Sequence, residues 1–148
     1  MATRRTFLLG AAGAMAFAAV PAANAQVRPL VTVYKSPTCG CCGEWEKHMQ
    51  ASGFRVDTHK VPNVVPIKGN LGVPQALHSC HTAIVGGYVL EGHVPASDVK
   101  RLLSERPKIT GLAVPGMIPG SPGMEQGTPQ PYATIAFDDR GTRVFAQH

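Results

Sequence analysis

Three of the four cysteines of this 148-residue chain lie within four positions, in the sequence Cys39-Gly-Cys41-Cys42. The fourth, Cys80, directly precedes His81. Thiolates at such a site do two kinds of chemistry, since they either attack a disulfide or bind a soft metal ion. A cluster this dense is hard to explain as packing, so we take it as the candidate functional site.

In an oxidising compartment, four cysteines are first interpreted as two disulfides, for which three pairings exist. One pairing is unfavourable, because the Cα atoms of adjacent residues lie only about 3.8 Å apart and a Cys41–Cys42 bond would be strained. Both remaining pairings use Cys80. A binding module held by two disulfides is therefore one structural interpretation of the sequence.

Cys41 favours metal binding over simple disulfide exchange. An exchanger needs only Cys39 and Cys42, and a thiol between them invites unproductive pairing. Zinc fits less well, because adjacent cysteines have difficulty pointing at the same tetrahedral ion. Copper(I) is soft and can share bridging thiolates, so a site with more than one cuprous ion uses every thiol, with Cys80 as the fourth ligand.

Three further residues are weaker candidates for metal ligands. Met117 and Met124 lie in PGMIPGSPGME, and their thioethers suit cuprous copper, although they could instead anchor this segment against the body. His81 is expected to be a ligand, a hydrogen-bonding neighbour of the site, or a structural histidine. Trp45 is expected in the core. The remaining histidines considered are expected to be structural or solvent-facing: His48, His59, His78 and His93.

The elements around the cysteines place them where a strand leads into a helix. The apolar pattern predicts a buried strand over residues 30–34, a helix over 43–52 and a second strand over 54–61. The Cys39-Gly-Cys41-Cys42 sequence then lies at or just before the helix N-terminus. The partial positive charge there stabilises thiolates, so one or more of these thiols is expected to have a lowered pKa.

The middle of the chain continues this alternation of strands and helices. The sequence PNVVPIKGNLGVP is expected to be loop, and QALHS a short helix. Two strands, 82–85 and 88–91, flank Gly86-Gly87 as a hairpin. A helix capped by Ser97 follows and is ended by Pro107. This order predicts an α/β, thioredoxin-like layered fold with a mixed sheet.

Two features are predicted for residues 107–148. The sequence GLAVPGMIPGSPGMEQGTPQP, rich in Gly and Pro, is expected to form a flap without regular structure. YATIAF and TRVFAQ then predict a terminal β-hairpin. With a core over about 30–106, residues 26–148 are expected to be a single thioredoxin-like metal-binding domain.

Residues 1–25 predict an export signal. The paired Arg4 and Arg5 fit a twin-arginine signal, and the apolar stretch that follows is shorter than the roughly 20 residues needed to span a bilayer. Ala23-Asn24-Ala25 resembles a cleavage site. We therefore expect a periplasmic protein without stable membrane insertion after cleavage. The formal charge of +5 at pH 7 is scattered, which argues against nucleic-acid binding.

Four segments of the chain, SPTCGCCGEWEKHM, LGVPQALHSCHTAIVGGYVLEGHVPA, DVKRLLSERP and GLAVPGMIPGSPGME, resemble the bacterial copper-resistance family typified by CopG. The resemblance runs from about residue 31 to residue 125. It implies a thioredoxin-like fold with a cysteine-bridged cluster of several cuprous ions in periplasmic copper resistance. The ligands that it implies are Cys39, Cys41, Cys42 and Cys80.

The leading hypothesis is a copper-binding protein rather than an enzyme, which stores Cu(I), passes it to a periplasmic chaperone or efflux component, or cycles its redox state. The enzymatic alternative is a thiol-disulfide oxidoreductase with Cys39 as nucleophile and Cys42 as resolving thiol. These two hypotheses differ on Cys41 and Cys80, which the metal site requires and the oxidoreductase does not.

Overall fold

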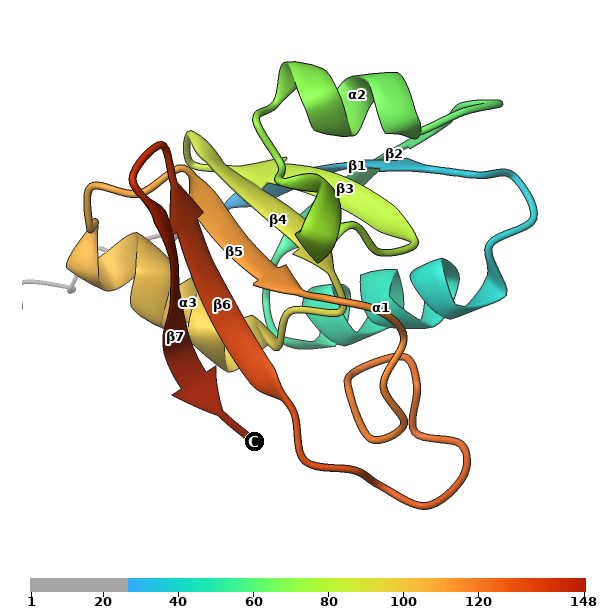
Figure 1. Cartoon of the computed structure of the whole chain (residues 1–148). Helices are drawn as coiled ribbons and strands as arrows, with labels where there is room; N and C mark the ends of the chain where they lie inside the picture. The colour runs from blue at the N-terminus through green and yellow to red at the C-terminus, as the bar shows by residue number, and fades with distance from the viewer. Residues whose placement is uncertain (1–26) are drawn as a thin grey trace, which may run out of the picture.

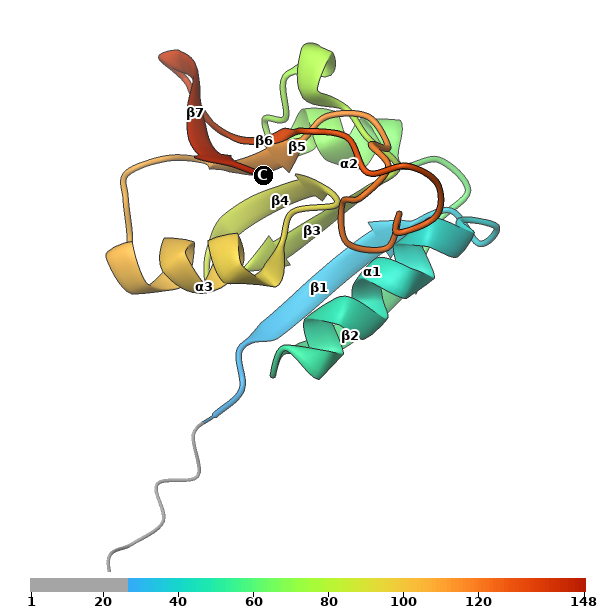
Figure 2. The same cartoon turned by 90° about the horizontal axis from the view of Figure 1, so that it is seen from below.

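A computed structural model describes residues 27–148, which form a seven-stranded mixed sheet with α1 and α3 on one face and α2 on the other (Figures 1 and 2). The strand order is β2-β1-β3-β4-β5-β6-β7. The α/β class and the mixed sheet are thus confirmed, and the order of elements through α3 agrees with the thioredoxin-like interpretation. The export signal predicted for residues 1–25 lies outside the described residues.

The first unit is a strand, a helix and a second strand. β1 (Leu30–Lys35) and β2 (Arg55–Lys60) pair in parallel, and α1 (Gly40–Ala51) connects them. β1 buries Val31 and Val33, which alternate with less buried neighbours. Both strands form where the apolar pattern predicts them, and the helix begins three residues earlier than expected.

One face of α1 packs against the sheet. Cys42, Trp45 and Met49 are fully buried and follow the spacing of a single helix face. Trp45 also donates a hydrogen bond from Nε1 to the carbonyl of Val94 at 2.9 Å. The expectation that Trp45 is a core residue is confirmed.

The prediction of a loop over PNVVPIKGNLGVP is partly wrong, because Val65–Asn70 forms a short helix, α2. Its proline lies in the first turn, where a missing N–H costs nothing and the fixed φ favours the helix. Asn63 Oδ1 also accepts a hydrogen bond from the Val65 N–H at 3.0 Å. The expected short helix in QALHS is present as the 3-10 turn Gln75–Leu77.

The hairpin and the helix after it form as predicted, with one correction. β3 (His81–Val85) and β4 (Tyr88–Gly92) pair antiparallel, and α3 (Ala96–Glu105) follows. Ser97 is not the N-cap, because it lies inside α3. The Ala96 N–H instead donates to Nε2 of His48 at 3.0 Å, so a distant side chain supplies the acceptor.

The beginning of the expected flap is a buried strand, which corrects the sequence prediction. β5 (Gly111–Val114) pairs in parallel with β4, and its last three residues are fully buried. A Cβ at Gly111 would collide with the Val89 carbonyl, so glycine permits this close pairing. The flap is therefore shorter than expected. From here on, the flap denotes residues 115–132.

The chain ends in the predicted hairpin, β6 (Ala133–Asp138) and β7 (Gly141–Gln147), which extends the sheet beyond β5. The larger core cluster includes residues of α1 and α3, and a smaller one contains Val73, Leu77, Val89, Ala113 and Phe137. Within residues 27–148, no helix combines the length and the apolar character needed to cross a membrane.

Candidate metal centre

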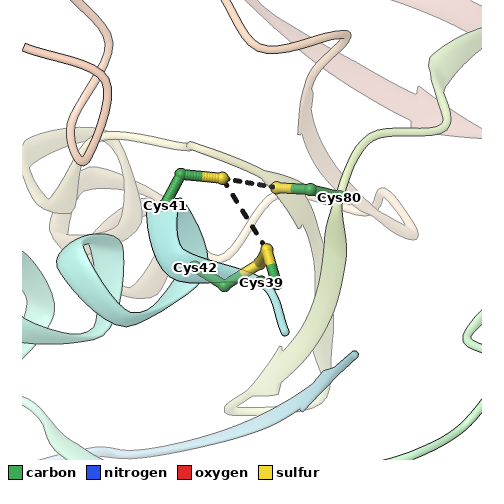
Figure 3. A group of neighbouring side chains, drawn as sticks. All are labelled: Cys39, Cys41, Cys42 and Cys80. Carbon is green, nitrogen blue, oxygen red and sulfur yellow. Dashed lines mark hydrogen bonds between the residues drawn. A yellow bond between two sulfur atoms is a disulfide. The ribbon is translucent and has the colours of Figure 1, made fainter. Parts of the chain in front are cut away.

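The four cysteine sulfurs meet at the N-terminus of α1, all within 4.8 Å of one another (Figure 3). Cys39 is the N-cap residue of α1, and Cys41 and Cys42 lie in its first turn. Cys80 directly precedes β3. The structure therefore brings together all four cysteines singled out in the sequence.

The register of the sheet explains why residues so far apart in the chain meet. β1 and β3 are antiparallel, and Lys35 at the end of β1 pairs with His81 at the start of β3. The segment after Lys35 and the segment before His81 therefore lie at the same end of these two strands. Cys80 belongs to the second of these segments and the other cysteines follow the first.

Two of the cysteines are joined in this structure. A disulfide links Cys39 to Cys42, whose Cα atoms are 5.4 Å apart, and the thiols of Cys41 and Cys80 are free. Neither of the two-disulfide pairings considered from the sequence is formed, because each requires Cys80. The Cys41 sulfur lies 3.7 Å from that of Cys39 and 3.9 Å from that of Cys80.

Two buried histidines adjoin Cys80. His81 and His93 are both fully buried, and the Cys80 sulfur lies 3.3 Å from Nδ1 of His81 and 3.0 Å from Nε2 of His93. The structure places His81 beside the cysteines, where the sequence analysis considered it. The solvent-facing position considered for His93 is wrong, because its ring is buried and faces Cys80, whereas the structural role considered for it stays a prediction.

A signal for His93 is present in the sequence. The two-residue turn at Gly86-Gly87 determines the hairpin register, in which Thr82 pairs with Glu91. Two positions further from the turn, the same register sets Cys80 opposite His93. The register set by this turn therefore predicts that His93 lies beside Cys80.

A buried polar network holds the backbone before Cys80. Oε1 of Glu91 accepts hydrogen bonds from the Ser79 N–H and from Nζ of Lys68, both at 2.6 Å. Oε2 of the same carboxylate accepts from the Thr82 hydroxyl at 2.7 Å. Lys68 and Glu91 are almost completely buried, so this ion pair lies in a region where an unpaired charge is costly. The network positions the segment that carries Cys80.

The local environment determines the protonation of the site. Burial, together with the neighbouring Cys41, raises the pKa of the Cys80 thiol to about 12. Metal binding must therefore displace a proton from Cys80. Burial also lowers the pKa of His81 well below its usual value, so this imidazole is neutral at neutral pH and its nitrogen lone pair is available to a metal.

The flap lies against the cysteines. The Ser79 hydroxyl donates to the Gly116 carbonyl, and Nδ1 of His93 donates to the Pro122 carbonyl at 2.6 Å. A Cβ at Gly123 would lie 2.8 Å from the Cys41 carbonyl oxygen, so only glycine allows the flap to approach α1 this closely.

The two methionines of the flap both lie near Cys41, in different surroundings. Sδ of Met117 lies 3.9 Å from the Cys41 sulfur, although the residue is 55% exposed. Met124 lines a cleft of about 400 Å³ beside Cys41, with Glu44 and Gln126 also in its walls. Sδ of Met117 thus lies within reach of an ion bound by Cys41.

Comparison with known proteins matches residues 77–124 to a family described as DUF411, a protein of unknown function. A solved structure of copper resistance protein CopG, form 2, is 41% identical over 82% of this chain and 98% of that chain, with a TM-score of 0.78. Form 1 of CopG is also 41% identical, over 80% and 96% of the two chains, with a TM-score of 0.76. Comparison with curated proteins gives no significant match.

Proposed function

Because this chain belongs to the copper-binding family typified by CopG, we propose that it is a periplasmic protein that holds several cuprous ions in a thiolate-bridged site. The family and the cysteine cluster support a role connected with copper. The oxidation state, the number of ions and the location are part of the proposal.

The observation that carries the proposal is the position of the Cys41 sulfur. It lies 3.7 Å from the sulfur of Cys39 and 3.9 Å from that of Cys80. These separations are too long for covalent bonds, yet short enough for one soft ion to contact two sulfurs at once. Cys41 can therefore act as a bridging thiolate between ions bound on either side, as cuprous copper permits.

Full use of the site requires the Cys39–Cys42 disulfide to be reduced. Reduction takes two electrons and two protons, which a dithiol reductant supplies as it becomes a disulfide itself. Four thiols then become available, and each loses its proton as it binds copper. The disulfide form described here offers only the thiols of Cys41 and Cys80. The redox state of the Cys39–Cys42 pair therefore controls how many thiolates can bind copper.

The export route is part of the same proposal. Arg4 and Arg5 support twin-arginine export, and cleavage after Ala25 would release the domain into the periplasm. Fractionation of cells that express the chain, compared with an Arg4→Lys, Arg5→Lys variant, tests this route. Periplasmic copper chaperones or efflux components are the proposed exchange partners.

Anaerobic loading of the reduced protein with Cu(I) tests the metal site. We expect more than one copper per chain, and fewer after Cys41→Ser. His78→Gln is a suitable control, because that ring lies on the same segment as Cys80 but contacts the Val73 carbonyl at 3.3 Å. Less than one copper per chain, or an unchanged count after Cys41→Ser, would contradict the proposal.

The Cys39–Cys42 disulfide also favours a second candidate, a thiol-disulfide oxidoreductase. Cys39 and Cys42 lie at the N-terminus of α1, where a nucleophilic thiolate would be stabilised once the disulfide is reduced. In that reaction the Cys39 thiolate attacks a substrate disulfide to give a mixed disulfide, and the Cys42 thiolate then releases the reduced substrate. Metal-free reduction of insulin by the dithiol form, unaffected by Cys41→Ser or Cys80→Ser, would favour this candidate.

A further inference from the structure

An apolar groove lies at the end of the sheet opposite the cysteines. It consists of two adjoining hollows of about 490 Å³ and about 200 Å³, whose walls share Pro29, Ser52, Gly53 and Lys100. These residues belong to the segment before β1, the turn between α1 and β2, and α3 (Figure 2). The cysteines follow the other end of β1, whose six residues span about 17 Å. The groove is therefore a surface separate from the candidate metal centre.

The walls of the groove are largely apolar. Phe54, which is buried, and Leu103, which is half-buried, line the smaller hollow, and Val27, which is 84% exposed, lines the larger one. Gly53 has no side chain, and a Cβ built on it would meet no atom within 4 Å, so the space above it is open. Exposed apolar surface of this kind, bordered by polar groups, is typical of sites that bind another molecule.

Two cations border the groove without a carboxylate to neutralise them. Arg28 and Lys100 are exposed and line the larger hollow, and none of the described residues in the walls is acidic. Neither forms a salt bridge in the described part of the chain, whereas the neighbouring Arg101 pairs with Glu105 at 3.0 Å. Residues 1–26 contain no Asp or Glu. The charge of the groove therefore favours an acidic occupant.

The distribution of acidic residues argues against a second copy of this chain as that occupant. Seven of its nine Asp and Glu residues pair with a basic side chain of the same chain. The formal charge of the chain is +5, so two copies repel each other at long range. A different molecule with free carboxylates fits the groove better.

We propose that the groove is a docking site for an acidic and apolar peptide segment of a partner protein. Leucine or phenylalanine side chains of that segment enter the hollows above Phe54 and Gly53, and flanking Asp or Glu side chains pair with Arg28 and Lys100. A partner held there leaves the cysteines accessible, because they lie at the other end of β1 and α1. The inference does not depend on the metal or on its binding.

A random-peptide phage library tests the chemistry of the occupant. The library is first depleted on Ser52→Trp, whose indole would fill the groove, and is then selected on the purified wild-type protein. We expect enrichment of peptides that combine Leu or Phe with neighbouring Asp or Glu. Absence of any peptide that distinguishes the two proteins, or enrichment of basic peptides, would overturn the inference.

A second pair of variants keeps the test valid if Ser52→Trp fails to fold, because it changes only exposed side chains. The library is then depleted on Arg28→Glu, Lys100→Glu instead. This variant should bind an enriched peptide at least about tenfold more weakly in fluorescence anisotropy. Lys60→Glu, Lys108→Glu is the matched control, because it makes the same charge change at exposed positions that line neither hollow. An equal loss in the control would overturn the inference.

Other occupants give different results in two further measurements. A dimer in sedimentation that Ser52→Trp disrupts would assign the groove to a second copy. Binding to phosphatidylglycerol vesicles that Arg28→Glu, Lys100→Glu abolishes would assign it to a lipid surface, and either result would overturn the inference. Peptide affinity should be unchanged in Cys41→Ser, so a failure of the metal site and a failure of the groove can be distinguished.

Discussion

The carbonyl oxygen of Pro122 accepts a hydrogen bond from Nδ1 of His93 at 2.6 Å, which joins the flap to the residue that follows β4. The other nitrogen of the same ring faces the Cys80 sulfur at 3.0 Å. The flap and the cysteines are therefore connected through one imidazole. Changes that displace the flap are expected to reach the metal centre.

Gly123→Ala should detach the flap from α1. The alanine Cβ would lie 2.8 Å from both the Cys41 carbonyl oxygen and the Trp45 backbone nitrogen. Gly127→Ala is a matched control, because Gly127 has the same φ of 87° and open space around its Cβ. Urea unfolding should show that Gly123→Ala costs about 1–3 kcal/mol more than the control. Equal losses would mean that the approach of the flap is not restrictive.

Met117→Leu should weaken Cu(I) binding more than Met124→Leu. Sδ of Met117 is 3.9 Å from the Cys41 sulfur, whereas Met124 lines the neighbouring cleft. Leucine keeps a similar volume but removes the thioether. Competition with a chromophoric Cu(I) chelator should show a loss of about tenfold for Met117→Leu and a smaller one for Met124→Leu. If both variants retain full affinity, the methionines only anchor the flap.

Glu91→Gln should strongly destabilise the fold. Nζ of Lys68 would lose its charged partner at 2.6 Å while remaining buried, which typically costs about 3–5 kcal/mol. Adding Lys68→Met should recover much of that loss in urea unfolding. Glu44→Gln is the control, because its pair with Lys47 is exposed and worth about 0–1 kcal/mol. A small loss for Glu91→Gln alone would show that the network does not hold the Cys80 segment.

Much of the site follows from local sequence. The valine-rich run and the helix period that begins after it predict the turn carrying Cys39, Cys41 and Cys42. The Gly86-Gly87 turn predicts the hairpin that carries Cys80. These features depend on neighbours in the chain, which is why they can be predicted without a structure.

The features that were missed have different physical causes. β5 is only four residues long and lies among glycines and prolines, so its strand character appears only when β4 and β6 flank it. α2 contains Pro66, which resembles a helix breaker unless its place in the first turn is known. His93 reaches the site through hairpin register rather than through any motif around it.

The stability of the metal-free protein should fall as the pH drops below 6.5. Burial lowers the pKa of His48 from its ordinary value of 6.5, and the pKa values of His81 and His93 are lowered for the same reason. Because the unfolded chain then binds protons at a higher pH than the folded chain, acid favours unfolding between 6.5 and the folded pKa values.

His48→Gln tests one part of this pH dependence. Nε2 of His48 accepts from the Ala96 N–H, and a glutamine oxygen can accept from the same group without titrating. Urea unfolding at a series of pH values should give this variant a shallower loss of stability below pH 6.5 than the wild type. Identical slopes would show that His48 does not contribute.

X-ray absorption at the copper edge tests the central claim, that four thiolates bridge more than one cuprous ion. The sample is the fully reduced protein, loaded with Cu(I) under anaerobic conditions until binding is complete. The proposal predicts an edge typical of Cu(I), a shell dominated by sulfur, and scattering from a neighbouring copper that weakens in Cys41→Ser. A spectrum with no copper neighbour at full loading would contradict it.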